Sequence, residues 1–540
     1  MMRRRTLLTA AAAAPLWAGC ERTDAPAFDG GWVGANAVRG HAWRDGAERI
    51  TPSTTKRTAV AIVGAGIAGL AAARALRRAG IDDLRVFELE DQAGGNARGH
   101  EIAGIACPLG AHYLPLPGRE AREVSEWLHE LGLARSEHGG TVWDERHLCH
   151  APQERLLLRE GGAGRWIDGL LPLADPGAST LAALRRFAGA VREVQRLGFS
   201  QPTLRSRWTP THAALDAVSF AAWLDANGHA DPALRWYLDY CCRDDYGAGS
   251  ARVSAWAGLH YFASRHGFHA PGEGRDEPLD PVLTWPEGNA WLARRLAAGL
   301  DDRLATGAVV ERIAPSRHEV ALDVLDARGG RTRWIAQHAI VCVPLFVAAR
   351  LVENAPPVLA QAARAMHYAP WLVSNLHVRE PLAQRAGAPA AWDNVLHESP
   401  ALGYVDARHQ LLDPRPGATV LTHYWALGGN SVQEAAGQRR ALLDRPWRDW
   451  AQAVLDDLAF AHPDLAAKTA RIDLMRYGHA MAIPVPGLRG HAALAALARE
   501  GEGAQRRLHF AHADLSAQSV FEEAFTRGTL AGEAAARALA

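Results

Sequence analysis

The chain of 540 residues carries no excess charge and almost no lysine. Its 59 basic and 59 acidic residues give a formal net charge of zero, and the basic residues are scattered, so we expect neither nucleic acid nor an acidic polymer as a partner. Only Lys56 and Lys468 among the basic residues are lysines. After residue 20 the sequence also lacks an apolar run of membrane-spanning length, so we expect no membrane span.

Cysteine is scarce as well. One of the six cysteines, Cys20, lies in the N-terminal segment, and the spacings of the others fit no zinc-binding pattern, so we expect no metal site. Their odd number does not require a disulfide framework, and buried thiols are the expected state. These other cysteines are Cys107, Cys149, Cys241, Cys242 and Cys342.

A glycine-rich turn between a strand and a helix is the strongest local pattern. Residues 59–63 form an apolar run typical of a buried parallel strand, and Gly64, Gly66 and Gly69 follow with the spacing GxGxxG. The first glycine permits a tight turn, the second lets a pyrophosphate approach the backbone, and the third lets the helix pack on the strand. The helix predicted from about Ile67 to Arg78 would direct its N-terminal amides at the phosphates.

A second predicted strand, Leu84–Phe87, ends in Glu88, 24 positions after Gly64. A carboxylate there accepts hydrogen bonds from a ribose diol and favours an unphosphorylated ribose. Because strand, turn, helix, second strand and acid occur in this order, the stretch predicts dinucleotide binding rather than an isolated glycine-rich turn. The expected contacts from this stretch are Gly64, Ala65, Gly66, Ile67, Ala68, Gly69, Glu88 and Leu89.

The run from Glu88 to Arg98 narrows the dinucleotide. It resembles the segment that follows the ribose glutamate in the flavin-containing amine oxidase superfamily, which includes monoamine and polyamine oxidases, protoporphyrinogen oxidases and carotenoid desaturases. The resemblance implies FAD as the cofactor. Gly94 and Gly95 match the family's glycine pair, and Asn96 replaces the arginine that usually follows; all three are implied cofactor contacts.

The run Cys107–Tyr113 resembles the family segment that passes the flavin. Gly110 and Ala111 would let the backbone approach the ring, since larger side chains would block it. The resemblance implies cofactor contacts from Gly110, Ala111 and His112. His112 is also a candidate catalytic residue, with a satisfied structural histidine as the alternative.

Two later segments resemble further parts of the cofactor site. Thr306–Ile313 is similar to the family strand whose valine contacts the adenine, and Leu508–Ser516 is similar to the closing strand, with its acid one residue later than in relatives. The helix that begins around Glu522 would direct its N-terminal dipole at the N1–O2 edge of the flavin. The contacts implied here are Val310, Asp514, Glu523 and Ala524.

Acids interleaved with aromatic residues occur in two segments outside these matches. Asp244 and Asp245 lie in the segment 236–247, and Asp393 and Glu398 lie in the segment 392–398. Such a composition could hold a cationic amine by charge and by cation–π contact. Solvated acids beside core aromatics are the structural alternative. Asp244, Asp245 and Asp393 are the candidate substrate-binding acids.

Most members of the amine oxidase branch hold a lysine that positions a water at the flavin N5. The predicted strand Trp371–Val378, where this lysine would be expected, has Ser374 or Asn375 instead. These two are therefore candidate catalytic positions. The missing lysine implies that the reduced flavin reacts slowly with oxygen and that a different electron acceptor is used. Tyr477 resembles one wall of the family's aromatic cage and is a candidate catalytic and substrate-binding residue.

The expected fold class is α/β, a Rossmann-type FAD-binding domain interleaved with an α+β substrate domain, as the resemblance implies. The predicted organisation is a signal peptide at 1–20, a polar tether at 21–57, an FAD-binding domain at 58–117, 281–345 and 472–540, and a substrate domain at 118–280 and 346–471.

The N-terminal segment reads as a targeting signal. Arg3, Arg4 and Arg5 precede a short apolar run, as in a twin-arginine export signal, which carries folded proteins; a Sec signal is the alternative. Leu16–Cys20 resembles a lipoprotein cleavage box, with Trp17 at the position of the usual leucine. We therefore expect a periplasmic protein with Cys20 as a candidate lipid anchor.

Three functions follow from these patterns. The first is an FAD-dependent amine oxidoreductase, acting on a small amine such as a polyamine, in which hydride passes from the amine α-carbon to flavin N5 and leaves an imine. The second is a desaturase or a protoporphyrinogen-oxidase-like enzyme, which would need an apolar channel. The third is a flavin-bearing polyamine sensor with decayed catalysis. Asn96, the missing lysine and His512, which stands where the relatives' closing strand has glycine, lend weight to it.

Overall fold

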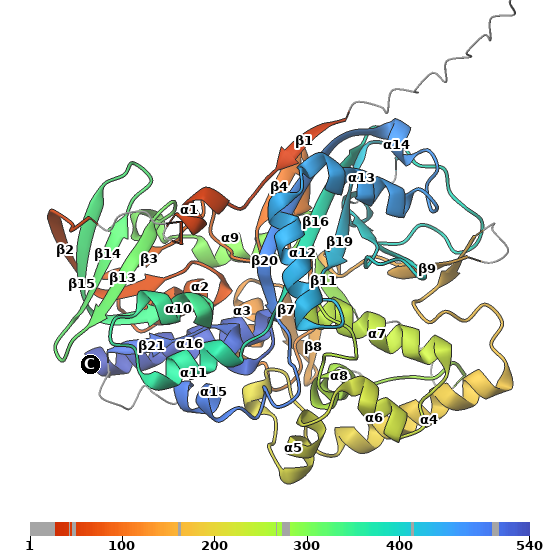
Figure 1. Ribbon diagram of the computed structural model, residues 1–540, viewed down its shortest axis with the longest axis horizontal. Helices are drawn as coiled ribbons and strands as arrows, with labels where there is room; N and C mark the ends of the chain where they lie inside the picture. The colour runs from red at the N-terminus through yellow and green to blue at the C-terminus, as the bar shows by residue number, and fades with distance from the viewer. Residues whose placement is uncertain are drawn as a thin grey trace, which may run out of the picture.

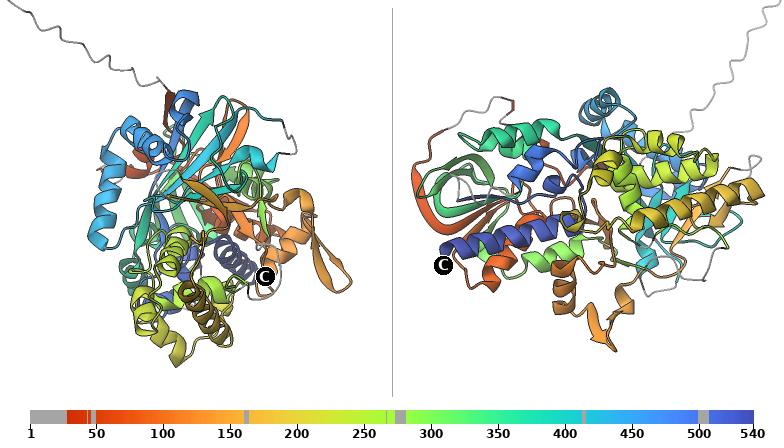
Figure 2. Two further views of the ribbon diagram at one scale, coloured as in Figure 1. Left: turned by 90° about the vertical axis from the view of Figure 1, so that its right-hand side faces the viewer. Right: turned by 90° about the horizontal axis from the view of Figure 1, so that it is seen from below.

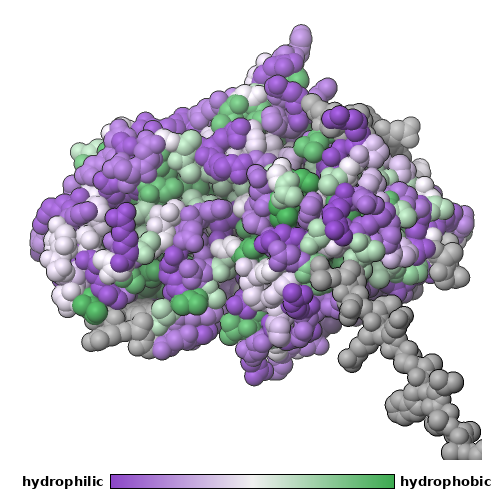
Figure 3. Space-filling model, turned by 90° about the horizontal axis from the view of Figure 1, so that it is seen from above, coloured by the Kyte–Doolittle hydropathy of each residue, from purple (hydrophilic) through white to green (hydrophobic). Residues whose placement is uncertain are grey.

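The computed structural model describes residues 28–42, 44–45, 50–159, 164–265, 267–272, 281–411, 415–498 and 507–540. The predicted signal and the candidate anchor Cys20 lie outside these residues. Two regions lie side by side, each built around one sheet (Figure 1). On the face shown in Figure 3, apolar residues form scattered patches between polar ones, as is usual for protein surface in contact with water.

A seven-stranded sheet from three parts of the chain forms the first region. Its strands are β2 (Thr54–Val63), β3 (Leu84–Phe87), β12 (Leu304–Ala305), β13 (Val309–Pro315), β14 (Val320–Leu325), β15 (Arg331–Val341) and β21 (Leu508–Phe510). The pairs β12–β3, β3–β2, β2–β15 and β15–β21 are parallel, and β13, β14 and β15 pair in antiparallel fashion. Residues 60–63 of β2 are buried on both faces, as the apolar run predicts for a central parallel strand.

Helices cover both faces of this sheet (Figure 2). One face carries α2 (Ile67–Arg78), α3 (Arg122–Glu130), α9 (Ala290–Ala297) and α16 (Phe521–Leu539); the other carries α10 (Leu345–Leu351), α11 (Pro357–Ala365) and α15 (Ala492–Leu497). Helices α2 and α16 pack backbone to backbone. A Cβ atom on Gly528 would lie 2.0 Å from the Ala68 carbonyl oxygen, and one on Gly532 would lie 2.6 Å from that of Ala72. Only glycine allows this approach.

An eight-stranded mixed sheet forms the second region. In spatial order its strands are β1 (Asp29–Trp32), β20 (Thr469–Ala482), β16 (Tyr368–Val378), β19 (Thr419–Ala426), β18 (Tyr404–Asp406), β17 (Asp393–Leu396), β9 (Glu154–Leu158) and β10 (Arg165–Asp168). The long antiparallel pair β16–β20 runs through it.

Side chains alternate along this sheet between two cores. The residues of β16 that include Trp371 and Val373 face α4 (Ala178–Gln195), α5 (Pro210–Asp216), α6 (Phe220–Ala226), α7 (Pro232–Tyr246) and α8 (Ala255–Ala263). Leu372 and Leu376 face α12 (Val432–Asp444), α13 (Trp447–Leu458) and α14 (Leu465–Lys468). Three small antiparallel pairs complete the fold: β4 (Gly99–Ile102) with β5 (Ile105–Pro108), β6 (Tyr113–Pro115) with β11 (Val282–Thr284), and β7 (Ala134–Glu137) with β8 (Gly140–Trp143).

The predicted fold class is confirmed, but the predicted boundaries need correction. The tether prediction for 21–57 is wrong in its described part, because residues 29–32 form β1 and residues 37–41 form helix α1 (Ala37–His41). Residues 345–365 pack on the first sheet although 346–471 was assigned to the substrate domain, and 472–482 belong to the second sheet. None of the helices in the described ranges combines the length and apolar character needed to cross a bilayer.

Candidate active site

Two cavities adjoin where the two regions meet. The larger has a volume of about 620 Å³ and begins at the glycine-rich turn; the smaller has a volume of about 150 Å³ and lies beside α7 and β16. They share one wall, so a ligand in the larger cavity would lie next to a ligand in the smaller one. The shared residues are Asn96, Ala111, Asn289, Ala480, Ser519, Val520 and Phe521.

The three glycines of the turn differ in what surrounds them. Gly64 has φ +96°, and a Cβ atom on Gly69 would lie 1.9 Å from the Gly64 carbonyl oxygen, so both are required by the fold itself. A Cβ atom on Gly66 would meet only the Gly95 Cα atom, at 3.8 Å. The backbone at Gly66 therefore faces open space in the cavity, as a site for a pyrophosphate requires.

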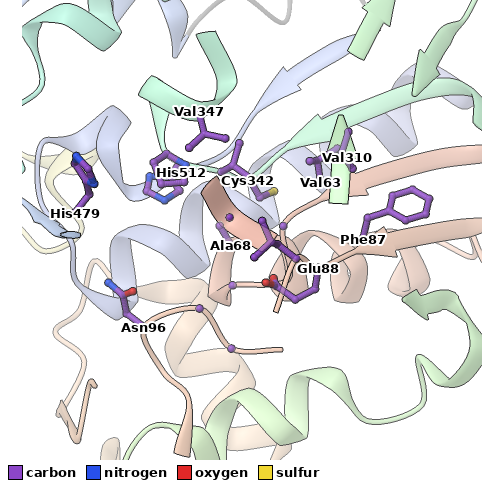
Figure 4. Close-up of a pocket in the computed structure, with 18 of the residues that line it drawn as sticks. Val63, Ala68, Phe87, Glu88, Asn96, Val310, Cys342, Val347, His479 and His512 are labelled. Carbon is purple, nitrogen blue, oxygen red and sulfur yellow. The ribbon is translucent and has the colours of Figure 1, made fainter. Parts of the chain in front are cut away.

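Glu88 is fixed at the end of β3 with its carboxylate in the larger cavity. Its Oε2 accepts a hydrogen bond from the Ala65 amide at 2.8 Å, and its Oε1 accepts one from the Glu90 amide at 2.9 Å. Burial raises the pKa of Glu88, and the two amide donors act in the opposite direction. Figure 4 shows Phe87 and Val310 on one side of Glu88 and Asn96 and His479 on the other.

Two helix N-termini open into the larger cavity. Gly66 precedes α2 and Val520 precedes α16, and neither residue caps its helix with a side-chain hydrogen bond. The first-turn amides and the dipoles of both helices are therefore directed at the ligand space. These groups fit an FAD cofactor: an open glycine backbone would face its pyrophosphate, Glu88 would accept from its ribose, and the α16 N-terminus would supply further amide donors.

Most of the predicted cofactor contacts line the larger cavity: Gly64, Gly66, Ile67, Ala68, Glu88, Leu89, Gly94, Gly95, Asn96, Ala111, Val310, Asp514 and Ala524. Ala65 and Gly69 support the turn from behind, and Gly110 and His112 line the smaller cavity instead. The prediction that Glu523 contacts the cofactor needs correction. Its side chain is fully buried and accepts hydrogen bonds from Gln201 and from the Thr203 amide, so it points away from the larger cavity.

The smaller cavity combines carboxyl groups with aromatic walls. Asp244 and Asp245 reach it from α7, Glu522 reaches it from α16, and Arg265 pairs with Asp245 at 3.1 Å. Burial and the neighbouring Asp245 raise the pKa of Asp244 to about 7, and burial raises the pKa of Glu522 to about 7. The aromatic lining is Tyr113, Trp371, Tyr424, Tyr477 and Phe521.

The predicted substrate acid Asp393 and its neighbour Glu398 lie elsewhere. Asp393, at the start of β17, lines neither cavity; burial raises its pKa, and Asp244 adds to this shift. Glu398 is exposed in a turn with φ +64° and lies outside both cavities. Both residues belong to β17 and the turn that follows it, and neither element lines the two cavities.

Of the predicted catalytic residues, Tyr477 and His112 line the smaller cavity, and Ser374 and Asn375 line neither cavity. Tyr477 lines the smaller cavity, with its hydroxyl donating to the Leu109 carbonyl at 2.8 Å. His112 lines it too, but stacks on Tyr424 at 4.4 Å, and burial lowers its pKa to about 3. The neutral, stacked ring supports the structural alternative.

The predicted catalytic role of Ser374 and Asn375 needs correction, because these residues line neither cavity. Ser374 is fully buried on the opposite face of β16 from Val373, which does line the smaller cavity. Asn375 donates to the Pro108 carbonyl at 3.0 Å and accepts from Thr422 at 2.7 Å. The alternation of side chains along a strand turns Ser374 away from the ligand space. Asn375 shares a face with Val373, but its amide is engaged by Pro108 and Thr422.

Several lining residues carried no sequence signal. Arg265, Trp371, Tyr424 and Ala480 come from different elements, and Glu522 was expected only as a helix start. Neither lysine is near: Lys468 pairs with Asp464 at 2.8 Å, and Lys56 lies over the Trp334 ring at 5.6 Å. The described residues that line the two cavities include no lysine.

The fold and the paired cavities fit a class of protein, the flavin-dependent oxidoreductases. Residues 67–539 match the family described as flavin containing amine oxidoreductase, and the chain belongs to that family. The family confirms FAD as the cofactor and an FAD-dependent oxidoreductase as the enzyme class.

Curated relatives resemble parts of the chain. A putative flavin-containing monoamine oxidase of Mycobacterium tuberculosis is 27% identical over 314 residues, which cover 58% of this chain and 62% of the relative. Polyamine oxidase 1 of Zea mays is 44% identical over 178 residues, which cover 30% of this chain and 32% of the relative. The chain thus matches less than two thirds of the length of either.

Solved structures agree over nearly their whole length. Putrescine oxidase bound to putrescine has a TM-score of 0.64 and 17% identity, covering 89% of this chain and 99% of that chain. Cyclohexylamine oxidase from Brevibacterium oxydans has a TM-score of 0.63 and 21% identity, with the same coverage. At such identity these similarities establish the fold.

Proposed function

We propose that this protein oxidises an amine with more than one cationic nitrogen, a diamine or polyamine, to an imine that water hydrolyses. The observation that carries the proposal is the smaller cavity, in which Asp244 and Glu522 lie among aromatic side chains next to the flavin space. Carboxylates and aromatic faces together recognise alkylammonium groups. The similarity to a structure of putrescine oxidase and to a maize polyamine oxidase supports this choice.

The residues of the smaller cavity would hold and orient the amine. FAD, when bound, supplies the acceptor for the hydride that leaves the amine α-carbon. The Asp244 carboxylate would hold the distal ammonium, while Tyr424, Tyr477 and Phe521 exclude water from the reacting carbon. Glu522, with a pKa of about 7, can take up at its carboxylate oxygen the proton that the reacting ammonium must lose.

We infer that the electron acceptor is not chiefly oxygen. The resemblance to amine oxidases assigns the reaction with oxygen to a lysine beside the flavin, and the described lining of both cavities contains none. A periplasmic protein with such a site would act as a dehydrogenase.

Oxidation of an amino acid is a second candidate, because Arg265 lines the same cavity and guanidinium groups bind carboxylates. Its ion pair with Asp245 at 3.1 Å occupies that guanidinium, which favours the diamine.

An anaerobic absorbance spectrum of the purified holoprotein tests both candidates. Bleaching of the flavin band by putrescine or spermidine, with a weaker response to a monoamine of equal length, is the expected result. Bleaching by amino acids alone would overturn the diamine proposal in favour of the second candidate. Admission of air afterwards should restore the band slowly, while an artificial quinone should restore it rapidly; fast recovery in air would contradict the dehydrogenase inference.

We also propose export to the periplasm by the twin-arginine route. Fractionation of cells that express the chain with Arg3→Lys and Arg4→Lys tests this. We expect the unsubstituted protein in the periplasm or membrane fraction and the variant in the cytoplasm. Export of both would support the Sec route instead.

A further inference from the structure

The segment that precedes the dinucleotide turn is built into the fold. Strand β1 joins the edge of the eight-stranded sheet parallel to β20, in the register Asp29↔Arg471 to Trp32↔Leu474. Arg471 pairs with Asp29 at 2.9 Å, and a Cβ atom on Gly30 would lie 1.9 Å from the Ile472 carbonyl oxygen. This close approach anchors the segment to the eight-stranded sheet.

From β1 the chain crosses to the first region, which contains the larger cavity, and a buried arginine holds it there. Arg98, only 5% exposed, donates from Nη1 to the Gly34 carbonyl at 2.6 Å and from Nε to the Gly95 carbonyl at 2.9 Å. The Asn36 amide donates to Glu90 Oε2 at 2.8 Å. One side chain therefore joins the segment to the glycine pair that lines the larger cavity.

Helix α1 then lies at the mouth of that cavity. Arg39 donates from Nη1 to the Leu89 carbonyl at 2.6 Å and to Asp91 at 2.9 Å, while its Nε and Nη2 make no hydrogen bond to a described residue. Val38 is 84% exposed, the highest value among the large apolar side chains in the described ranges. The lining residues from this segment are Asn36, Val38, Arg39, Gly40 and Ala42.

We propose that α1 is part of the FAD site and closes its adenosine half, with the Arg39 guanidinium and the Val38 side chain in contact with the ligand. Leu89, which fixes Arg39, follows the ribose-type carboxylate Glu88, and the α1 residues that line the larger cavity do not line the smaller one. A planar guanidinium stacks on a purine or donates to ribose and phosphate oxygens. An exposed valine at a cavity mouth gains burial when the cavity fills.

Docking of this segment and cofactor binding are therefore coupled, each strengthening the other. The segment lies outside the family match, which begins at residue 67. The proposal concerns FAD alone and stands whether or not the substrate is a diamine.

Titration of the apoprotein with FAD, followed by flavin fluorescence, tests the proposal. Arg39→Ala should raise the Kd for FAD roughly tenfold, which corresponds to about 1.4 kcal/mol. ADP, a probe of the adenosine half, should lose affinity to the same extent, whereas FMN, a probe of the ring half, should bind as before. Arg44→Ala is the matched control, since Arg44 belongs to the same segment, pairs with Asp45 alone among the described residues and lines neither cavity.

Equal affinities of Arg39→Ala and the unsubstituted protein for FAD and ADP would overturn the proposal, as would an equal loss of FMN and ADP binding. If Arg39→Ala fails to fold, Arg39→Lys keeps the charge but not the planar donor group, and the same two comparisons apply. Limited trypsin digestion gives an independent readout: FAD should protect the bond after Arg39 in the unsubstituted protein, and cleavage at one rate with and without FAD would contradict the coupling.

Discussion

Arg265 Nη2 lies 3.1 Å from Asp245 Oδ1 in the wall of the smaller cavity, and both side chains are mostly buried, 19% and 8% exposed. The pair keeps one carboxylate neutralised while Asp244, its neighbour in sequence, keeps a carboxyl available to the cavity. Arg265 and Asp245 thus neutralise each other, and the Asp244 carboxyl remains able to bind a cation.

The first prediction concerns this pair. Arg265→Gln leaves Asp245 buried without its partner, and we expect a loss of about 3–5 kcal/mol of stability, measured by chemical unfolding of the holoprotein. The exposed pair Arg196–Glu193 offers a control, since Arg196→Gln should change stability by less than about 1 kcal/mol. Adding Asp245→Asn to Arg265→Gln should restore most of the loss; a double variant as unstable as the single one would contradict the account.

The second prediction concerns pH. The pKa of Asp244 is raised to about 7, so the group is largely protonated at pH 5.5 and ionises as the pH rises to 8. Attraction for an ammonium group increases in that direction, so the KM for a diamine should fall roughly tenfold over this range, as for a gained charged hydrogen bond. Asp244→Asn should flatten the profile, whereas Glu398→Gln, at an exposed position, should not. An unchanged pH slope in Asp244→Asn would assign the titration to another group.

The third prediction separates two glycines of the turn. Gly66→Ala places its methyl group in open cavity space, so the apoprotein should unfold within about 1 kcal/mol of the unsubstituted apoprotein while its affinity for FAD falls at least about tenfold. Gly69→Ala would clash with the Gly64 carbonyl and should destabilise the apoprotein itself. Unfolding curves and the ratio of flavin to protein absorbance distinguish the two; normal flavin content in Gly66→Ala would place the pyrophosphate elsewhere.

The fourth prediction concerns the strand where a lysine was expected. Ser374 is fully buried, and its hydroxyl has no hydrogen-bond partner among the described residues, so Ser374→Ala should keep kcat and be neutral or stabilising by up to about 1 kcal/mol. Asn375→Ala should lower stability by about 1–3 kcal/mol, because Asn375 bridges Pro108 and Thr422. Thermal unfolding and steady-state rates measure both. A large loss of kcat in Ser374→Ala, with stability intact, would return that residue to the catalytic site.

The cofactor site was largely predictable because its signals are local. Gly64, Gly66, Gly69 and Glu88 lie within 25 consecutive residues of one strand–helix–strand unit. The prediction failed where a side chain's direction mattered. Glu523 shares the first turn of α16 with Ala524, yet points to Thr203 while Ala524 lines the cavity.

The sequence by itself determined the nucleotide turn, the ribose carboxylate and the parallel strands around them, because periodicity and glycine spacing act over a few residues. Tertiary structure alone decided the smaller cavity, whose lining comes from positions as distant as Tyr113, Arg265 and Glu522. It also decided that residues 28–42 belong to the fold, since β1 is stabilised by pairing with β20, more than 400 residues away. Such pairing depends on a partner strand that no local pattern specifies.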